Sequence, residues 1–89
     1  MRGIEELRRE IDALDEQLTE ILAERQNLVR QIGLYKKANN LPALDDKRKK
    51  EVTEKFKKRA AAAGLDENFA RDLYELIHRY AVKIEEDIK

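Results

Sequence analysis

The sequence predicts an all-α protein built from three helices, one very long and two shorter. Apolar residues recur at spacings of three and four along three segments, which is the period of a single buried helical face. The joints between these segments are short and contain residues that end helices, including Pro42 and Gly64. No segment alternates apolar and polar residues as a half-buried strand does. Together these patterns favour a helical bundle.

The longest predicted helix runs from Ile4 to Lys37. Its apolar face comprises Ile4, Leu7, Ile11, Leu14, Leu18, Ile21, Leu22, Leu28, Val29, Ile32 and Tyr35. The same series would place an apolar residue at position 25, where the chain has Arg25. A guanidinium in an apolar seam requires an anion beside it, because burying an unpaired charge is costly. That anion is either a carboxylate of the protein or one of a bound ligand.

The length of this helix indicates a second copy of the chain. About 34 residues at roughly 1.5 Å each make a rod of roughly 50 Å, whereas a compact domain of this size is only about 30 Å across. The remaining residues are too few to cover the whole apolar face, so we expect an intertwined helical homodimer. The alternative is a kink near Gly33 that folds the helix back on itself.

The two shorter helices are bounded by capping residues. Residues 38–44 form a loop, and the second helix is predicted to start at Asp45 or Asp46 and to end near Ala63, before Gly64. Its apolar face is thin and consists of Val52, Phe56, Ala60 and Ala63.

The third helix is predicted to start at Asp66, another capping residue. Its apolar stripe contains Phe69, Leu73, Leu76, Ile77, Tyr80, Ala81, Ile84 and Ile88. A row formed by Tyr74, His78, Ala81 and Glu85 lies beside this stripe. The simplest interpretation makes Glu85 a solvated residue at the flank and His78 a partly buried helix residue.

Composition excludes several classes of function. The chain of 89 residues is the size of one domain, residues 1–89, and its 19 basic and 19 acidic residues cancel. Nothing in the net charge therefore favours nucleic acid or an anionic membrane as a partner. The chain contains no cysteine and one histidine, which argues against disulfides and zinc and suits the cytoplasm. It also has no apolar run of membrane-spanning length, and its first residues do not resemble a signal peptide.

Arg25 and Lys36 suggest a site for a small dianion. They are eleven residues apart, which is about three helical turns, so they share a face with Val29 and Ile32 between them. Two cations over an apolar floor suit a molecule with two anionic groups, and Arg48 adds a third cation. The alternative is that Arg25 pairs with an internal acid and the others are surface charges. No nucleophile–base pair, phosphate loop or metal-ligand spacing is present, so an enzyme here works by positioning and electrostatics.

An ordered set of residues extends over nearly the whole chain. It comprises Ala13-Leu14-Asp15, Leu22-Ala23-Glu24-Arg25, Ile32-Gly33 followed by Lys36, then Pro42, Asp45 and Arg48, with Arg8 near the start. This set resembles the all-helical chorismate mutase family. The resemblance implies three helices in an intertwined homodimer that converts chorismate to prephenate for phenylalanine and tyrosine synthesis. This pericyclic reaction needs no cofactor and no covalent intermediate, only a folded substrate and stabilised charge on the breaking ether bond.

The resemblance also assigns roles to residues at matching positions. It implies that Arg25 binds one carboxylate of chorismate and that Arg8 of the partner subunit binds the other. Lys36 is implied to donate to the ether oxygen and to a carboxylate. Arg48 is implied to lie against the substrate, and Asp45 to hold the ring hydroxyl. The pocket walls are implied to be Val52, Ile32 and Val82.

Three positions depart from the pattern common among bacterial members. Lys49 stands in the substrate-binding set where a Glu is usual, which leaves Asp45 as the main candidate for the hydroxyl. Ala81 replaces a residue that is often Ser, with little consequence expected. Glu85 replaces a Gln that donates to the ether oxygen, and an ionised carboxylate accepts hydrogen bonds only. Glu85 can therefore act as a catalytic donor only when protonated, so turnover is expected to rise as the pH falls.

Two other functions fit the same residues. Isochorismate–pyruvate lyase acts on a similar dicarboxylate on the same scaffold, and release of pyruvate would distinguish it. A non-catalytic helical dimerisation or regulatory module would make Arg25 a structural ion pair.

Overall fold

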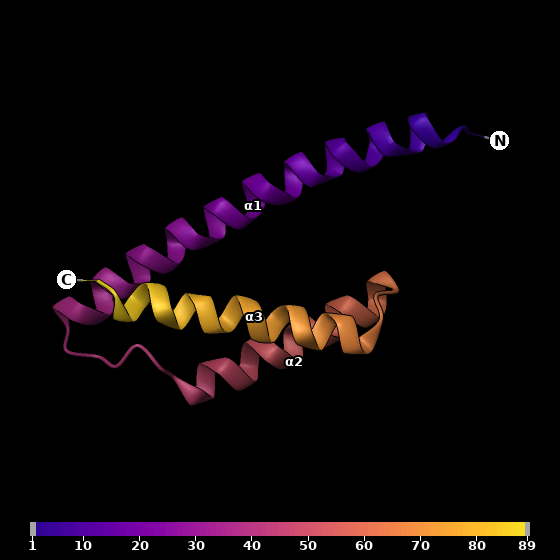
Figure 1. Ribbon diagram of the computed structural model, residues 1–89. Coiled ribbons are helices and arrows are strands. Elements are labelled where there is room, and N and C mark those ends of the chain that lie inside the picture. The colour runs from indigo at the N-terminus through magenta and orange to yellow at the C-terminus, as the bar shows by residue number, and fades with distance from the viewer. Residues whose placement is uncertain (1, 89) are drawn as a thin grey trace.

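The computed structural model describes residues 2–88, which form three α-helices and no strand. They are α1 (Ile4–Ala38), α2 (Asp46–Ala63) and α3 (Glu67–Glu86) (Figure 1). The all-α prediction is confirmed, and each predicted boundary lies within one or two residues of the observed one. Within the described part of the chain, no helix combines the length and the apolar character needed to cross a membrane.

The predicted capping residues set the ends of the two shorter helices. The Asp45 side chain accepts a hydrogen bond from the Arg48 backbone N at 3.1 Å, and Asp66 accepts one from the Phe69 backbone N at 2.9 Å. Each carboxylate thereby satisfies an N–H group that has no partner within its own helix. Gly64 ends α2 in the left-handed conformation with φ of 79°, where a residue without a Cβ is favoured.

The three helices form an open V rather than a closed bundle. Both α1 and α2 pack against α3 and, within residues 2–88, not against each other. Figure 1 shows the C-terminal half of α1 beside α3 and its N-terminal half running away from the other helices. The chain measures 57 × 25 × 15 Å, and α1 continues through Gly33, so the alternative in which the helix folds back is wrong. The helix overhangs the rest of its chain, as its length predicts.

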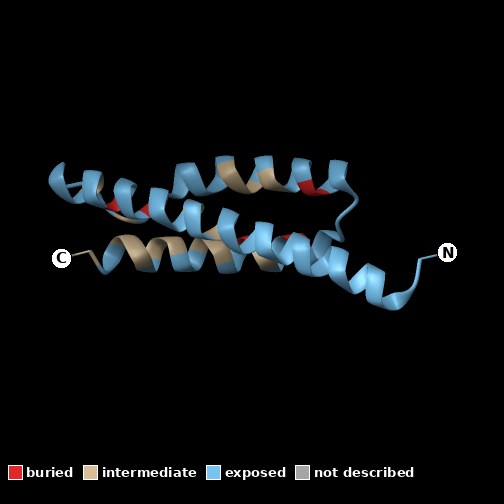
Figure 2. Cartoon of the chain, turned by 90° about the horizontal axis from the view of Figure 1, so that it is seen from above, coloured by how far each residue is buried: buried red, intermediate tan, exposed pale blue. Residues whose placement is uncertain are grey.

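The chain leaves most of its apolar surface exposed. Within residues 2–88 the buried hydrophobic residues are Val29, Ala60, Ala70 and Tyr74, and most of α1 is exposed (Figure 2). The exposed large hydrophobic residues of α1 are Ile4, Leu7, Ile11, Leu14, Leu18, Ile21, Leu28, Ile32, Leu34 and Tyr35. Burial of apolar area is the main term that stabilises a folded chain. One copy alone therefore gains only part of the stabilisation that burying its apolar residues could provide.

Two expectations about buried faces are wrong. Ala63 is exposed, so the inward face of α2 ends at Ala60. On α3 the row beginning at Tyr74 lies at the centre of the packing, while Phe69 and Tyr80 of the predicted stripe are 54% and 50% exposed. The reason is that α3 is contacted by α1 and by α2, and the residues between these two contacts are the ones that become buried. Helical periodicity identifies an apolar stripe but not the position of its neighbours.

Candidate functional site

A cavity of about 160 Å³ lies where the three helices and the loop before α2 meet. Every residue predicted for the site, apart from Arg8, lines it. The lining residues are Arg25, Val29, Ile32 and Lys36 of α1; Ala43 and Asp45 of the loop; Arg48, Lys49 and Val52 of α2; and Tyr74, His78, Ala81, Val82 and Glu85 of α3. The fold therefore gathers groups that are up to sixty residues apart in the sequence.

An ion pair between Lys36 and Glu85 joins α1 to α3 at one end of the cavity. The Lys36 Nζ lies 2.7 Å from the Glu85 Oε1, and the two side chains are only 19% and 9% exposed. The Lys36 Nζ also donates a hydrogen bond to the Ala43 carbonyl oxygen at 2.8 Å. An ammonium group has three N–H donors. One of them is donated to Ala43. The Glu85 Oε1 accepts no hydrogen bond although it lies within ion-pair distance, so N–H groups of Lys36 remain for a ligand in the cavity.

Glu85 is therefore not the solvated flank residue that its sequence position suggests. The helices approach closely here because Gly33 has no side chain. A Cβ at Gly33 would lie 3.2 Å from both the Cα and the Cγ of Glu85, and closer still to the side chain of Ile88. Contacts this short would displace the last turn of α3. Gly33 thus sets the distance at which Glu85 meets Lys36.

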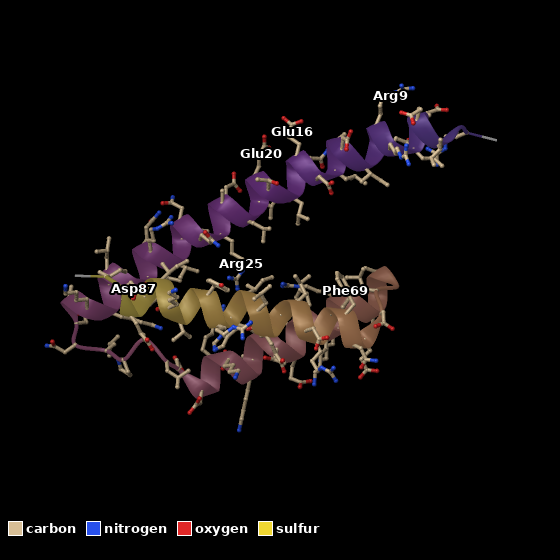
Figure 3. The ribbon with its side chains drawn as sticks, in the orientation of Figure 1. Arg9, Glu16, Glu20, Arg25, Phe69 and Asp87 are labelled. Carbon is tan, nitrogen blue, oxygen red and sulfur yellow. The ribbon has the colours of Figure 1, made fainter. Side chains whose placement is uncertain are left out.

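Arg25 lies farther along the same face of α1 and points toward α3 (Figure 3). Its neighbour along this face, Val29, is buried, so the guanidinium emerges beside an apolar floor, as predicted. Arg25 forms no ion pair with any carboxylate of residues 2–88. The hypothesis that an internal acid neutralises Arg25 therefore finds no support in the described part of the chain.

Helix α2 supplies the rim of the cavity. One carboxylate oxygen of Asp45 is committed to capping α2, which leaves the other available. Arg48 contacts Glu51 at 3.7 Å with both side chains about half exposed, and an exposed pair of this kind contributes little stability. The Arg48 guanidinium can therefore move toward a ligand at small cost. Lys49 completes this rim.

The lining of the cavity carries an excess of positive charge. It contains four cations, namely Arg25, Lys36, Arg48 and Lys49, against the carboxylates of Asp45 and Glu85. The chain as a whole has no net charge, so this excess is local. Two uncompensated positive charges over an apolar floor are complementary to a small dicarboxylate.

His78 is a polar group of the cavity that helical periodicity predicted only as a partly buried helix residue and not as part of the site. Its Nε2 is buried and, among the described residues, has no hydrogen-bond partner. Its ring stacks on Tyr74, with centroids 6.2 Å apart and planes inclined by 24°. The signal was available in the sequence, because His78 belongs to the row of Tyr74, Ala81 and Glu85, but periodicity alone could not show that this row faces a cavity.

The surroundings of His78 favour its neutral form. Burial lowers the pKa of His78 below its ordinary value of 6.5, and the charges of Lys49 and Arg25 lower this pKa further. Glu85 and Asp46 act in the opposite direction without reversing the shift. The cavity therefore contains a neutral imidazole among its cations near neutral pH.

Arg8 is the one predicted residue that does not reach this cavity. It pairs with Glu5 at 3.0 Å on an exposed part of α1. Seventeen residues separate Arg8 from Arg25, which places them about 25 Å apart along the helix axis. Arg8 of the same chain cannot complete the site.

Comparison with known proteins identifies the family. Residues 7–86 match the family of chorismate mutases of type II. The chain belongs to this family. The match spans all but the first and last few residues and includes every residue that lines the cavity. The matched residues thus contain the cavity, α2, α3 and all of α1 except its first three residues.

Named relatives agree with this assignment. The chain is 32% identical over 83 residues to the 4-amino-4-deoxychorismate mutase of Streptomyces venezuelae, covering 93% of this chain and 81% of that protein. It is 25% identical over 72 residues to the chorismate mutase of Methanocaldococcus jannaschii, covering 81% of this chain and 73% of that protein.

A longer relative contains a second activity. The chain is 41% identical over 56 residues, or 63% of its length, to the bifunctional chorismate mutase/prephenate dehydratase of Aquifex aeolicus. The matched segment spans only 16% of that protein.

The packing at Gly33 predicts the effect of an added methyl group. Gly33→Ala should reduce the free energy of unfolding by up to about 2 kcal/mol. Overpacking destabilises the fold by about 1–3 kcal/mol, and the higher helix propensity of alanine offsets about 1 kcal/mol of this. Urea denaturation followed by circular dichroism measures the change. Gly3→Ala is the matched control, since a Cβ there meets nothing within 4 Å. A Gly33→Ala variant more stable than the wild type would show that the contact with Glu85 does not constrain α3.

Proposed function

We propose that this chain catalyses the Claisen-type sigmatropic rearrangement of chorismate to prephenate. The observation that carries the proposal is Arg25, which lies on the wall of a cation-rich cavity without a carboxylate partner among residues 2–88. Membership of the family and the names of its relatives support this activity. Neither a lyase nor a non-catalytic module is favoured by these matches.

The charged groups of the cavity are suited to holding the folded substrate. Arg25 binds one carboxylate of chorismate, and Arg48 closes on the substrate from the rim. The free N–H of Lys36 donates to the ether oxygen, where negative charge develops as the C–O bond breaks. The apolar walls formed by Ile32, Val52 and Val82 press the side chain over the ring, which brings the two reacting carbons together. No group of the protein bonds covalently to the substrate.

The substrate carries a hydroxyl on its ring in this proposal. One relative is named for 4-amino-4-deoxychorismate, in which an amino group replaces that hydroxyl. An ammonium group in this cavity would meet the repulsion of Arg25, Lys36, Arg48 and Lys49. The excess of positive charge therefore favours chorismate over the amino compound.

The complete site requires a homodimer in this proposal. A groove of about 300 Å³ runs between α1 and α3 and is lined mainly by Leu22, Leu73, Leu76, Ile77 and Tyr80. The groove shares Arg25, Val29 and Ala81 with the cavity, so an element seated in the groove would reach the edge of the site. The exposed apolar face of α1 of a second copy has the composition to fill it. This arrangement brings Arg8 of the partner subunit to the second carboxylate.

The remaining features of the proposal follow from the chemistry and the composition. A pericyclic rearrangement requires neither a metal nor an organic cofactor. The balanced net charge gives no reason to expect a nucleic acid partner, and a chain without cysteine suits the cytoplasm.

Loss of Arg25 tests the proposal directly. Purified wild-type protein should convert chorismate to prephenate without releasing pyruvate. Arg25→Ala should lower kcat/KM by about a hundredfold, because charge-assisted hydrogen bonds to a carboxylate are worth about 1.5–3 kcal/mol. Prephenate and pyruvate are measured separately. Arg9→Ala is the control, since Arg9 points away from α2 and α3 (Figure 3) and should leave kcat/KM unchanged. A wild-type chain that binds no dicarboxylate, with Arg25→Ala affecting stability alone, would favour a structural module.

The protonation state of Glu85 should appear in the pH profile. In its ion pair with Lys36 the Glu85 carboxylate is ionised and cannot donate to the ether oxygen, so kcat should rise as the pH falls and Glu85 takes up a proton. Glu85→Gln should flatten this profile, because an amide donates at every pH. Glu86→Gln, which changes the exposed neighbouring residue, should retain the wild-type profile. A wild-type kcat that does not vary with pH would contradict the role of Glu85 as a donor.

Complementation between two inactive variants tests whether Arg8 acts across the dimer. Arg8→Ala and Arg25→Ala should each be nearly inactive alone. After unfolding and refolding together, random pairing should restore about a quarter of the wild-type activity, because half of the dimers then contain one intact site of two. Arg8→Ala refolded with itself is the control. A mixture no more active than its components would mean that Arg8 does not complete the site of a partner.

A further inference from the structure

His78 is a polar group of the cavity to which the proposed function gives no role. Its Nε2 is buried and has no hydrogen-bond partner among residues 2–88. Buried polar atoms in folded proteins are almost always hydrogen-bonded, because an unsatisfied one destabilises the fold. His78 lines the cavity, so a small movement of its side chain would bring this unsatisfied nitrogen to a bound ligand. The following inference rests on the proposed function and deepens it.

The imidazole is held in place by its neighbours. The ring stacks on Tyr74, which is itself 5% exposed and packs against the Phe56 ring of α2 with centroids 5.3 Å apart. These three rings join α3 to α2. The packing against Tyr74 therefore holds the imidazole beside the cavity without a ligand.

The chemistry of the cavity indicates which group of the substrate meets His78. Chorismate offers two carboxylates, an ether oxygen and one ring hydroxyl. The carboxylates are matched by arginines and the ether oxygen by Lys36, so the hydroxyl is the group that remains. A neutral imidazole nitrogen either donates or accepts a hydrogen bond, depending on the tautomer. A hydroxyl does both and therefore suits either tautomer.

We propose that His78 binds the ring hydroxyl of chorismate through Nε2 and thereby acts as a specificity residue for the substrate. The charged groups that face the imidazole are Arg25 of α1, Lys49 and Asp46 of α2, and Glu85 of α3. Burial, together with the charges of Lys49 and Arg25, favours the neutral form of His78, which suits a partner that is itself uncharged. Asp45, with one oxygen engaged in capping α2, lies at the rim and is available to the same hydroxyl only through its second oxygen.

Substrate discrimination tests this role. The probes are chorismate and its analogue that lacks the ring hydroxyl. In the wild type the analogue leaves Nε2 unpaired, so its kcat/KM should be lower by about ten- to a hundredfold. His78→Leu should lose most of this discrimination by slowing chorismate alone, and His78→Gln, which keeps an amide donor and acceptor, should recover part of it. Equal losses for both substrates in His78→Leu would mean that His78 only packs, which would overturn the proposal.

A measurement on the wild type does not depend on the folding of any variant. His78 is the only histidine of the chain, so a ¹⁵N-labelled sample gives a single imidazole signal for Nε2. A bicyclic dicarboxylate that mimics the transition state should shift this signal, and the same compound without its hydroxyl should shift it much less. Identical shifts from both compounds would overturn the role of His78 and leave the proposed function standing. Failure of both to bind, with no turnover of chorismate, would instead refute the proposed function.

Discussion

An uncompensated positive charge on an apolar helix face is the constraint on which the site depends. Arg25 interrupts the apolar series of α1 and lies over a floor formed by Val29 and its neighbours. Within residues 2–88 no carboxylate pairs with it. These residues do not neutralise the Arg25 guanidinium, which therefore remains available for binding an anion. Catalysis by electrostatic preorganisation requires this arrangement, in which charges are held ready and are not neutralised by the protein itself.

The fold holds Lys36, the second cation of the site, in a different way. Lys36 is fixed by Glu85 and by the Ala43 carbonyl, and α3 reaches Lys36 only because Gly33 leaves room for it. Arg25 thus has no partner within residues 2–88 and Lys36 is held in position, although both lie on the same face of α1. Such a division suits a reaction in which one group anchors a carboxylate and another must meet a single oxygen atom with defined geometry.

Folding and function depend on the same exposed apolar surface. Among residues 2–88 only four hydrophobic residues are buried, whereas ten large ones of α1 are exposed. The apolar groove beside the cavity shares three of its lining residues with it. A second copy that covered this surface would supply both the missing stabilisation and, in the proposed arrangement, the missing arginine. Stability and a complete site would then depend on one interface.

The sequence by itself determined the three helices, their ends, the length of α1 and the charged positions that surround the cavity. These features are local, since spacing, capping residues and helix length are properties of consecutive residues. Tertiary structure decided which row of α3 faces inward, and so buried Glu85, which spacing alone places on a solvated flank, and made His78 line the cavity. It also showed that Arg25 has no partner within the described chain. Both outcomes depend on where α1 and α2 pack against α3, which helical periodicity does not encode.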